Sequence, residues 1–302
     1  MNHANTKYIG RFAPSPTGPL HFGSLVAAVA SYLDARAHGG AWLVRIEDVD
    51  GTRCQPRFAD EILATLKAFG LNWDGEVMVQ SERTPQYQAA FDQLAGINLT
   101  YACACSRKEI ADSAITGIDG PVYPGTCRNL QLPPQRNAIR VRTMPGEICF
   151  ADRVQGRCGQ RLDADIGDFV LRRRDHLFAY QLAVVVDDAD QGITHIVRGA
   201  DLLDSTARQI YLQQLLHLPT PTYLHIPVVT NTAGQKLSKQ TLAPAISMLD
   251  ASNLLRDALN HLGQTLPTPQ PDTPAAWLAA AAHNWNVDAI PKLRSRVGMS
   301  SS

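Results

Sequence analysis

The 302-residue chain has 45% hydrophobic and 19% charged residues, a balance typical of globular proteins that excludes an intrinsically disordered chain. Its 28 Lys and Arg residues equal its 28 Asp and Glu residues, which excludes a polyanion binder driven by net charge or by a basic tail. No stretch reaches the roughly 20 apolar residues of a membrane span, and six cysteines are too few for a disulfide scaffold. We therefore expect a cytoplasmic protein with no membrane partner.

Residues 8 to 102 alternate apolar runs that favour strands with apolar residues at helical spacing. Such alternation is typical of βαβ units, so we predict an α/β fold with a parallel sheet and helices on its faces. The predicted elements are strands at Tyr8–Phe12, Ala41–Ile46 and Leu99–Ala102, and helices from Gly23, over Arg57–Ala68 and over Pro85–Leu94.

The regular pattern lapses between Cys103 and about Arg161, where repeated Gly and Pro residues predict an insertion. It then returns, and we expect the second half of the sheet there. After Lys239 the sequence predicts short helices and a frayed Ser-rich end. The segments expected in these regions are apolar runs at Phe169–Leu171, Tyr180–Val186 and His195–Val197, a helix over Ser205–Leu216, a strand at Leu224–Val229, and helices over Ile246–Leu262 and Ala275–Ala282.

A Pro-rich loop from Arg11 to Ser24 joins the first strand to the first helix. His21 and Gly23 lie where that helix begins, and a helix N-terminus offers N–H groups and a positive dipole end to a phosphate. The loop has the glycine spacing of neither a Walker loop nor a dinucleotide fingerprint, so an ordinary βα loop is the alternative interpretation.

Two charged segments follow predicted strands. The run Arg45 to Arg53 includes Glu47 at the carboxyl edge of the sheet, where a carboxylate can hold an ammonium group; a solvated acidic turn is the alternative. Lys236 and Lys239 lie in a loop and can place mobile positive charge over a triphosphate, although short basic loops are commonly just solvated.

Three of the six cysteines cluster in the insertion. Cys103, Cys105 and Cys127 can supply three thiolates to a zinc ion that stabilises a segment without an obvious core, and Tyr123 is the nearest fourth donor. Buried structural thiols are the alternative. The isolated residues Cys54, Cys149 and Cys158 are interpreted as small core residues.

Taken in order, these segments resemble the glutamyl-tRNA synthetase family of class I aminoacyl-tRNA synthetases. Arg11 to Ser24 is similar to the family's HIGH region, Arg45 to Arg53 to its R-I-E-D-x-D-x-x-R block, and Lys236 to Gln240 to its KMSKS loop. Residues 178–188 and 192–201 are similar to the second half of its catalytic domain. The resemblance implies a Rossmann-like parallel sheet of class I synthetase type. Ser24 departs from the family motif, since it replaces the second His of HIGH.

The resemblance also implies site residues. Glutamate carries two carboxylates and one ammonium group, and two arginines with one glutamate provide the matching charges. The residues implied for glutamate are Arg11, Ala13, Ser15, Glu47, Tyr180 and Arg198. Those implied for ATP, which acts with Mg²⁺, are His21, Gly23, Ser24 and Lys239, and the catalytic ones are His21, Lys236 and Lys239. A structural Zn²⁺ is implied at Cys103, Cys105, Tyr123 and Cys127.

Short members of the family share the Cys-x-Cys, Tyr, Cys pattern, and they imply an unusual acceptor. The reaction expected is activation of L-glutamate by ATP without tRNA, followed by transfer to the queuosine base in the anticodon stem-loop of tRNA(Asp). Arg172, Arg173 and Arg174 are candidates for phosphate contacts, with a solvated strand edge as the alternative. The rival functions are a truncated synthetase that charges tRNA(Glu) and a catalytically silent tRNA-binding paralogue.

The expected organisation has four segments. Residues 1–102 form the first half of the catalytic domain, 103–178 a zinc-bearing acceptor-binding insertion, and 179–230 the second half. Residues 231–302 carry the lysine loop and a short helical region, with no anticodon-binding domain. We expect a monomer.

Overall fold

The computed structural model describes residues 7–113, 115–237 and 244–298. Its strands are β1 (Ile9–Phe12), β2 (Ala41–Ile46), β3 (Met78–Val79), β4 (Thr100–Cys103), β5 (Thr116–Gly117), β6 (Gly120–Pro121), β7 (Ala138–Val141), β8 (Ile148–Asp152), β9 (Gly156–Gln160), β10 (Val170–Arg172), β11 (His195–Gly199), β12 (Thr222–Ile226), β13 (Val228–Thr230) and β14 (Ser295–Val297). Its α-helices are α1 (Phe22–Ala37), α2 (Pro56–Ala68), α3 (Thr84–Gly96), α4 (Arg107–Ser113), α5 (Leu162–Asp165), α6 (Tyr180–Asp190), α7 (Thr206–Leu215), α8 (Ala251–His261) and α9 (Pro274–His283). Short 3-10 helices cover Gln80–Arg83, Pro134–Arg136, Ala200–Ser205, Met248–Asp250 and Val287–Ala289.

The central sheet is parallel where the sequence predicts it to be. β1 pairs with β2 and β2 with β3, all parallel, and β11 pairs in parallel with β12 over its full length. The two halves meet where Thr194 donates its backbone N–H to the Ile9 carbonyl at 2.9 Å, which places β11 beside β1. The prediction of an α/β fold with a parallel sheet is therefore confirmed.

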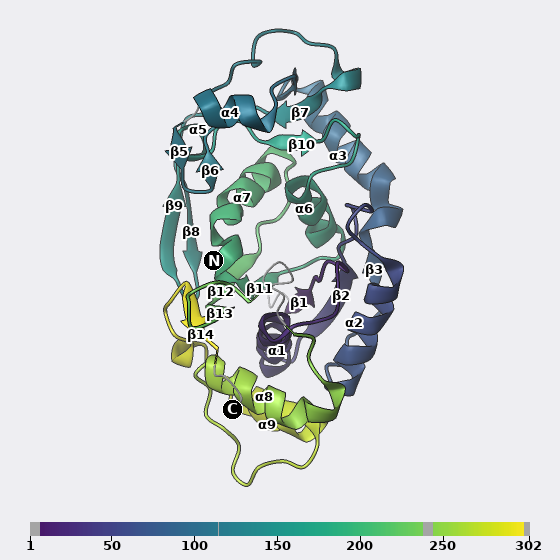
Figure 1. Ribbon diagram of the computed structural model, residues 1–302, viewed down its shortest axis with the longest axis vertical. Coiled ribbons are helices and arrows are strands. Elements are labelled where there is room, and N and C mark those ends of the chain that lie inside the picture. Colours follow the sequence, from purple (N-terminus) through teal and green to yellow (C-terminus); the bar gives the residue numbers. More distant parts are fainter. Residues whose placement is uncertain (1–6, 114, 238–243, 299–302) are drawn as a thin grey trace.

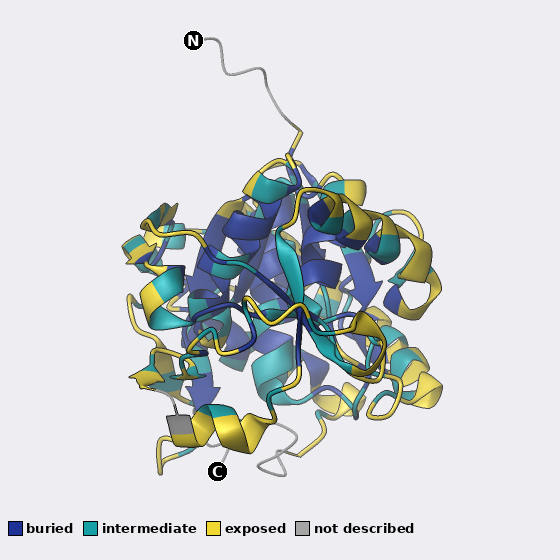
Figure 2. Ribbon diagram, turned by 90° about the horizontal axis from the view of Figure 1, so that it is seen from above, coloured by how far each residue is buried: buried dark blue, intermediate teal, exposed yellow. Residues whose placement is uncertain are grey.

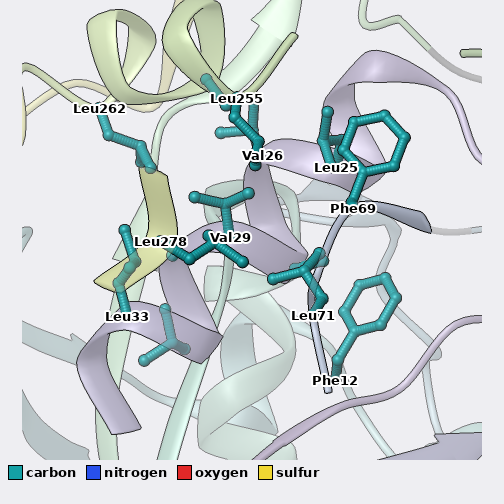
Figure 3. Packing of buried hydrophobic residues seen from close by; sticks show 14 of the residues in the cluster. Phe12, Leu25, Val26, Val29, Leu33, Phe69, Leu71, Leu255, Leu262 and Leu278 are labelled. Carbon is teal, nitrogen blue, oxygen red and sulfur yellow. The ribbon is translucent and has the colours of Figure 1, made fainter. Parts of the chain in front are cut away.

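Helix α1 is the central helix of the fold because it is apolar on nearly every side. It packs on β1 and β11 on one side and on α8 and α9 on the other (Figure 1). Figure 3 shows Val26 and Val29 of this helix among Leu255, Leu262 and Leu278 of the C-terminal region. The C-terminal helices are thus part of the same core as the sheet.

A buried polar cluster ties the C-terminal region to the sheet. Asp34 of α1 accepts hydrogen bonds from the Tyr8 hydroxyl at 2.5 Å and from the Trp285 indole nitrogen at 2.9 Å. The Arg153 guanidinium lies against both oxygens of the same carboxylate, at 2.5 and 3.0 Å. Burial alone would raise the pKa of Asp34, but its hydrogen bonds to Arg153 and the charge of that guanidinium lower the pKa overall. One carboxylate therefore joins the start of the chain, α1, the β8–β9 turn and the segment after α9.

Two predicted strands belong to a different sheet from the one expected. The strand predicted at Leu99–Ala102 is observed as β4, and the apolar run Phe169–Leu171 overlaps β10, but neither joins the parallel sheet. Both pair antiparallel with β7 in a separate three-stranded sheet. A short apolar run carries no information about its partner, and β7 lies in the region whose Gly and Pro content concealed it.

The run Tyr180–Val186, expected to contribute to the sheet, is instead the start of α6. Its apolar residues are buried on all sides, so the run shows no helical periodicity. The strand predicted over Leu224–Val229 divides into β12 and β13 at Pro227, and β14 near the C-terminus was not foreseen. β14 pairs in parallel with β13, the strand that leads toward the lysine loop.

The separate sheet and the C-terminal helices lie at opposite ends of the long axis (Figure 1). Buried residues gather in the middle of the molecule and exposed ones at its periphery (Figure 2). Among the helices of the described residues, none has the length and apolar character that spanning a bilayer requires. The predicted boundaries of the four segments stay predictions.

Candidate active site

Three adjoining cavities lie at the carboxyl ends of β1, β2 and β11, the edge at which open α/β sheets bind ligands. The inner cavity, of about 140 Å³, is lined by Arg11, Glu47 and Arg198 among others. The helix-end cavity, of about 250 Å³, lies against the N-terminus of α1, and the outer cavity, of about 460 Å³, opens beside Asp50. Ala13 and Leu202 line all three, so the cavities form one continuous site.

The structure brings the residues predicted for glutamate together around the inner cavity. Ser15 is the exception, since it lines the helix-end and outer cavities instead. The five predicted residues that line the inner cavity are Arg11, Ala13, Glu47, Tyr180 and Arg198. They come from β1, β11, the loops after β1 and β2, and the first turn of α6, segments far apart in sequence.

Buried charges behind the inner cavity hold two of these residues in place. Asp188 of α6 lies 3.2 Å from Nε of Arg11 and 2.8 Å from Nη2 of Arg45, and Arg45 lies 3.2 Å from Glu47. Burial alone would raise the pKa of Asp188, but the two guanidinium groups outweigh burial and lower it. Burial raises the pKa of Glu47, although the positive charges of Arg45 and Arg11 oppose this shift.

Arg198 enters the inner cavity from β11 with most of its hydrogen bonds already made. Its Nε donates to Nε2 of His225 at 2.9 Å, and its Nη2 donates to the Thr206 hydroxyl at 2.9 Å. Its Nη1 is buried and has no hydrogen-bond partner among the described residues. A buried guanidinium nitrogen without a partner is costly, and because Arg198 lines the inner cavity, a ligand there is the candidate acceptor for this nitrogen.

At the helix-end cavity, His21 has a structural role that was not foreseen. It is the N-cap of α1, and its Nδ1 accepts the Ser24 backbone N–H at 3.2 Å. A Cβ atom at Gly23 would lie 3.2 Å from two ring atoms of His21, a tight contact, and 3.4 Å from the Leu237 carbonyl oxygen. His21, Gly23 and Ser24, three of the residues predicted to bind ATP, all line this cavity.

Lys236 also lines the helix-end cavity, and its ammonium group lies 2.5 Å from the Asp201 carboxylate. Lys239 lies outside the described residues. The described residues on either side of its loop both lie at the start of α1: Leu237 approaches Gly23, and Ala245 pairs with His21. The loop thus begins and ends beside the helix-end cavity.

Of the three arginines predicted to contact phosphates, one lines the site. Arg173 lies at the outer cavity, 3.0 Å from Asp50. Arg172 is turned inward, with its guanidinium 4.8 Å from the centre of the Phe91 ring. Arg174 is exposed and donates to the carbonyl oxygen of Ala104, beside the cysteine cluster. Arg172 therefore does not fit the expectation of an exposed strand edge.

The cysteine cluster is assembled as the spacing suggested. The sulfur atoms of Cys103, Cys105 and Cys127 lie within 4.8 Å of one another. The Tyr123 hydroxyl lies 3.3 Å from the Cys103 sulfur and 3.9 Å from that of Cys105. Sulfur ligands at about 2.3 Å around a tetrahedral zinc ion would be separated by about 3.8 Å, close to the observed 3.5 Å between Cys105 and Cys127. The residues present fit a Zn²⁺ ion.

Without a metal, burial and the neighbouring thiols raise the pKa of Cys105 to about 11. The other cysteines do not form a second cluster. Cys54 and Cys158 are half-buried and Cys149 is exposed, so their interpretation as core residues is wrong, most clearly for Cys149. Cys149 lies on β8, a strand between β12 and β9 along which half-buried and exposed residues alternate before the buried Asp152.

Sequence reasoning missed the residues that support the site from behind. Arg45 and Asp188 both lie in segments quoted for the family resemblance, and charged residues within apolar runs could have marked them as buried partners. His225 and Asp152 gave no signal, because they lie 73 residues apart on strands whose pairing the sequence does not reveal.

Comparison with known proteins agrees with this geometry. The family described as tRNA synthetases class I (E and Q), catalytic domain, matches residues 8–265. The chain is 59% identical over 293 residues to Glutamyl-Q tRNA(Asp) synthetase of Dechloromonas aromatica, covering 95% of this chain and 97% of that protein. It is 53% identical to the protein of the same name in Aromatoleum aromaticum, covering 97% and 93%. Among solved structures, glutamate-tRNA synthetase of Elizabethkingia anophelis superimposes with a TM-score of 0.80 at 21% identity, covering 97% of this chain and 68% of that one.

Proposed function

The chain belongs to the class I tRNA synthetase family (E and Q), and on that premise we propose that it activates L-glutamate with ATP, without tRNA, and transfers it to the queuosine base in the anticodon of tRNA(Asp). The relatives named Glutamyl-Q tRNA(Asp) synthetase, at more than half identity over nearly the full length, support the acceptor. The protein is accordingly an enzyme of the ligase class.

The charge set of the inner cavity is the observation that carries this proposal. Two guanidinium groups, of Arg11 and Arg198, and one carboxylate, of Glu47, face a cavity of about 140 Å³. Glutamate presents the complementary set of two carboxylates and one ammonium group, and a charge-assisted hydrogen bond is stronger than a neutral one. Its ammonium group would add a second cationic partner to the Glu47 carboxylate, which already lies 3.2 Å from Arg45.

ATP would occupy the helix-end cavity, which adjoins the inner cavity at Ala13. The positive end of α1 and the ammonium group of Lys236 would face its phosphates, and Lys239 would join them from the adjacent loop. The glutamate carboxylate attacks the α-phosphorus, a P–O bond forms on that side, and the bond to pyrophosphate breaks on the other. No protein nucleophile is needed, since positioning and positive charge suffice. Mg²⁺ bound with ATP would neutralise further phosphate charge.

The acceptor base would enter through the outer cavity, which adjoins the inner one at Glu47 and Tyr180. Its walls combine apolar side chains, of Val49 and Phe178, with the guanidinium groups of Arg53 and Arg173 at the rim. Such a combination suits a splayed base flanked by phosphates. A hydroxyl of the base would attack the carbonyl carbon of glutamyl-adenylate, forming an ester and releasing AMP.

A structural Zn²⁺ ion in the insertion completes the proposal. Cys103, Cys105, Cys127 and Tyr123 would form a closed shell of four ligands, which leaves no position for a substrate. The ion would fix the insertion, whose small cluster of buried residues is centred on these same side chains.

The test of activation is glutamate-dependent exchange of pyrophosphate into ATP in the absence of tRNA. We expect exchange with the wild-type protein and a loss of about a hundredfold or more in kcat/KM for glutamate in Glu47→Gln, since a charged partner of the ammonium group is lost. Glu82→Gln, at an exposed position, is the matched control. Absence of exchange in the wild type would favour a catalytically silent paralogue.

A further inference from the structure

We propose that His225 and Asp152 are positioning residues for substrate glutamate: together they fix the Arg198 side chain so that its Nη1 alone is left to donate to a carboxylate. The inference rests on the proposed function, since it names what orients one side of the glutamate pocket. Neither residue lines the inner cavity, and both are buried.

The contact between Arg198 and His225 fixes which nitrogen of the imidazole carries the proton. An arginine Nε always bears hydrogen and can only donate. Because Nε of Arg198 lies 2.9 Å from Nε2 of His225, that imidazole nitrogen must be the acceptor. The histidine proton is therefore on Nδ1, which lies 2.6 Å from the Asp152 carboxylate. Burial lowers the pKa of His225 to about 4, so the ring is neutral and keeps this tautomer at neutral pH.

Asp152 is in turn held in one orientation by the backbone. Its Oδ1 accepts the backbone N–H groups of Val154, Gln155 and His225, at 3.0, 2.8 and 3.2 Å. Its Oδ2 is thereby turned to Nδ1 of His225. The chain of hydrogen bonds thus runs from the β8–β9 turn through β12 to Arg198 on β11.

This arrangement determines what Arg198 offers to a ligand. Nε is committed to His225 and Nη2 to Thr206, while Nη1 is buried without a partner among the described residues. A guanidinium held at two of its three nitrogens cannot rotate away from the cavity. Loss of the His225 acceptor would release one of the two restraints and leave a buried N–H unsatisfied.

Asp152→Asn provides a sharp test because of the three backbone donors. They hold the amide oxygen in the place of Oδ1, so the amide NH₂ must face Nδ1 of His225 and the ring proton must move to Nε2. Two N–H groups, from His225 and Arg198, then oppose each other. We expect the KM for glutamate in pyrophosphate exchange to rise about tenfold to a hundredfold, the range for losing a hydrogen bond to a charged group, with the KM for ATP unchanged.

A pair of variants at His225 separates positioning from packing. The amide oxygen of His225→Gln can reach the place of Nε2 and accept from Arg198, whereas His225→Asn can replace only Nδ1. We expect glutamate KM to rise much less in His225→Gln than in His225→Asn. Adding Asp152→Asn to His225→Gln should change the KM for glutamate by less than about twofold, because the glutamine has no imidazole tautomer for Asp152 to control. His195→Gln and His195→Asn, at the other end of β11, are the controls.

Histidine ¹⁵N chemical shifts test the same chain of hydrogen bonds, here called the Asp152–His225–Arg198 relay, without any reliance on activity. The His225 signal, assigned by its loss in His225→Gln, should show hydrogen on Nδ1 in the wild type and on Nε2 in Asp152→Asn. A wild-type Nε2–H tautomer would overturn the inference. So would unchanged glutamate KM in Asp152→Asn and His225→Asn, with only a lower unfolding temperature. If wild-type protein lacks exchange but shows the Nδ1–H tautomer and its inversion in Asp152→Asn, the relay stands and the proposed function fails.

Discussion

Replacing Asp188 by Asn should destabilise the protein strongly, because this carboxylate neutralises two buried arginines. Its side chain is 4% exposed and lies 3.2 Å from Nε of Arg11 and 2.8 Å from Nη2 of Arg45, which is fully buried. Breaking a buried ion pair by removing one partner costs about 3–5 kcal/mol. Asn keeps the shape and one acceptor, so we expect about 3 kcal/mol, the lower end of that range.

Urea unfolding at pH 7 measures this difference, and the same helix offers a matched control. Asp190 also pairs with an arginine, Arg83, but its side chain is 47% exposed, so Asp190→Asn should lower the free energy of unfolding by less than about 1 kcal/mol. Asp188→Asn should also raise the KM for glutamate, because Arg11 loses the partner that orients it. A free energy of unfolding within about 1 kcal/mol of wild type for Asp188→Asn would refute this account of the buried charges.

The difference in free energy of unfolding between wild type and Asp188→Asn should change with pH in a definite direction. The two arginines lower the pKa of Asp188 in the folded protein below the roughly 3.9 of an unfolded chain. A group of this kind stabilises the fold above its unfolded pKa, and that stabilisation is lost as pH falls through the folded pKa. The gap between wild type and Asp188→Asn should therefore be constant from about pH 5 to 8 and close only below about pH 4.

Three further outcomes follow from the geometry. Metal analysis should find one zinc per chain in the wild type and none in Cys103→Ser, with a lower unfolding temperature; zinc retained in that variant would exclude Cys103 as a ligand. Burial raises the pKa of Glu47, so kcat/KM for glutamate should fall on acidification at a higher pH than an ordinary Glu carboxyl would give, and a profile flat down to about pH 4 would contradict this. Trp285→Phe removes one donor to Asp34 and should lower the free energy of unfolding by about 1–2 kcal/mol without changing pyrophosphate exchange; reduced exchange would show that the cluster reaches the site.

The sequence predicts helices and strands best where apolar periodicity agrees with the Gly and Pro residues that end an element. The strand Ala41–Ile46 is observed with the predicted bounds, and α2 begins one residue before its predicted start. The sequence predicts poorly which strands pair with each other. β4 and β10 are short apolar runs that both pair with β7, and β7 lies in a Pro-rich region where no strand was predicted. The buried helix α6 is apolar all round, so the period that would distinguish it from a strand is absent.

Some of the residues that line the cavities could be predicted from the sequence, because they lie in short continuous motifs. Glu47 directly follows a predicted strand, so its position at the carboxyl edge of the sheet could be inferred, whereas Arg11 and the role of Lys236 came from the family motifs. The residues behind them act across long sequence separations. Asp152 meets His225 only because β8 lies beside β12, a pairing of a single register position that the sequence does not indicate.

The most direct test of the central claim is acylation with labelled glutamate of tRNA(Asp) that carries queuosine, of the same tRNA with unmodified guanosine, and of tRNA(Glu). The proposed function predicts that only the queuosine-containing tRNA(Asp) is labelled, and that its isolated anticodon stem-loop is labelled too. Label at the 3′ end of tRNA(Glu) would contradict it and identify the protein as a conventional glutamyl-tRNA synthetase.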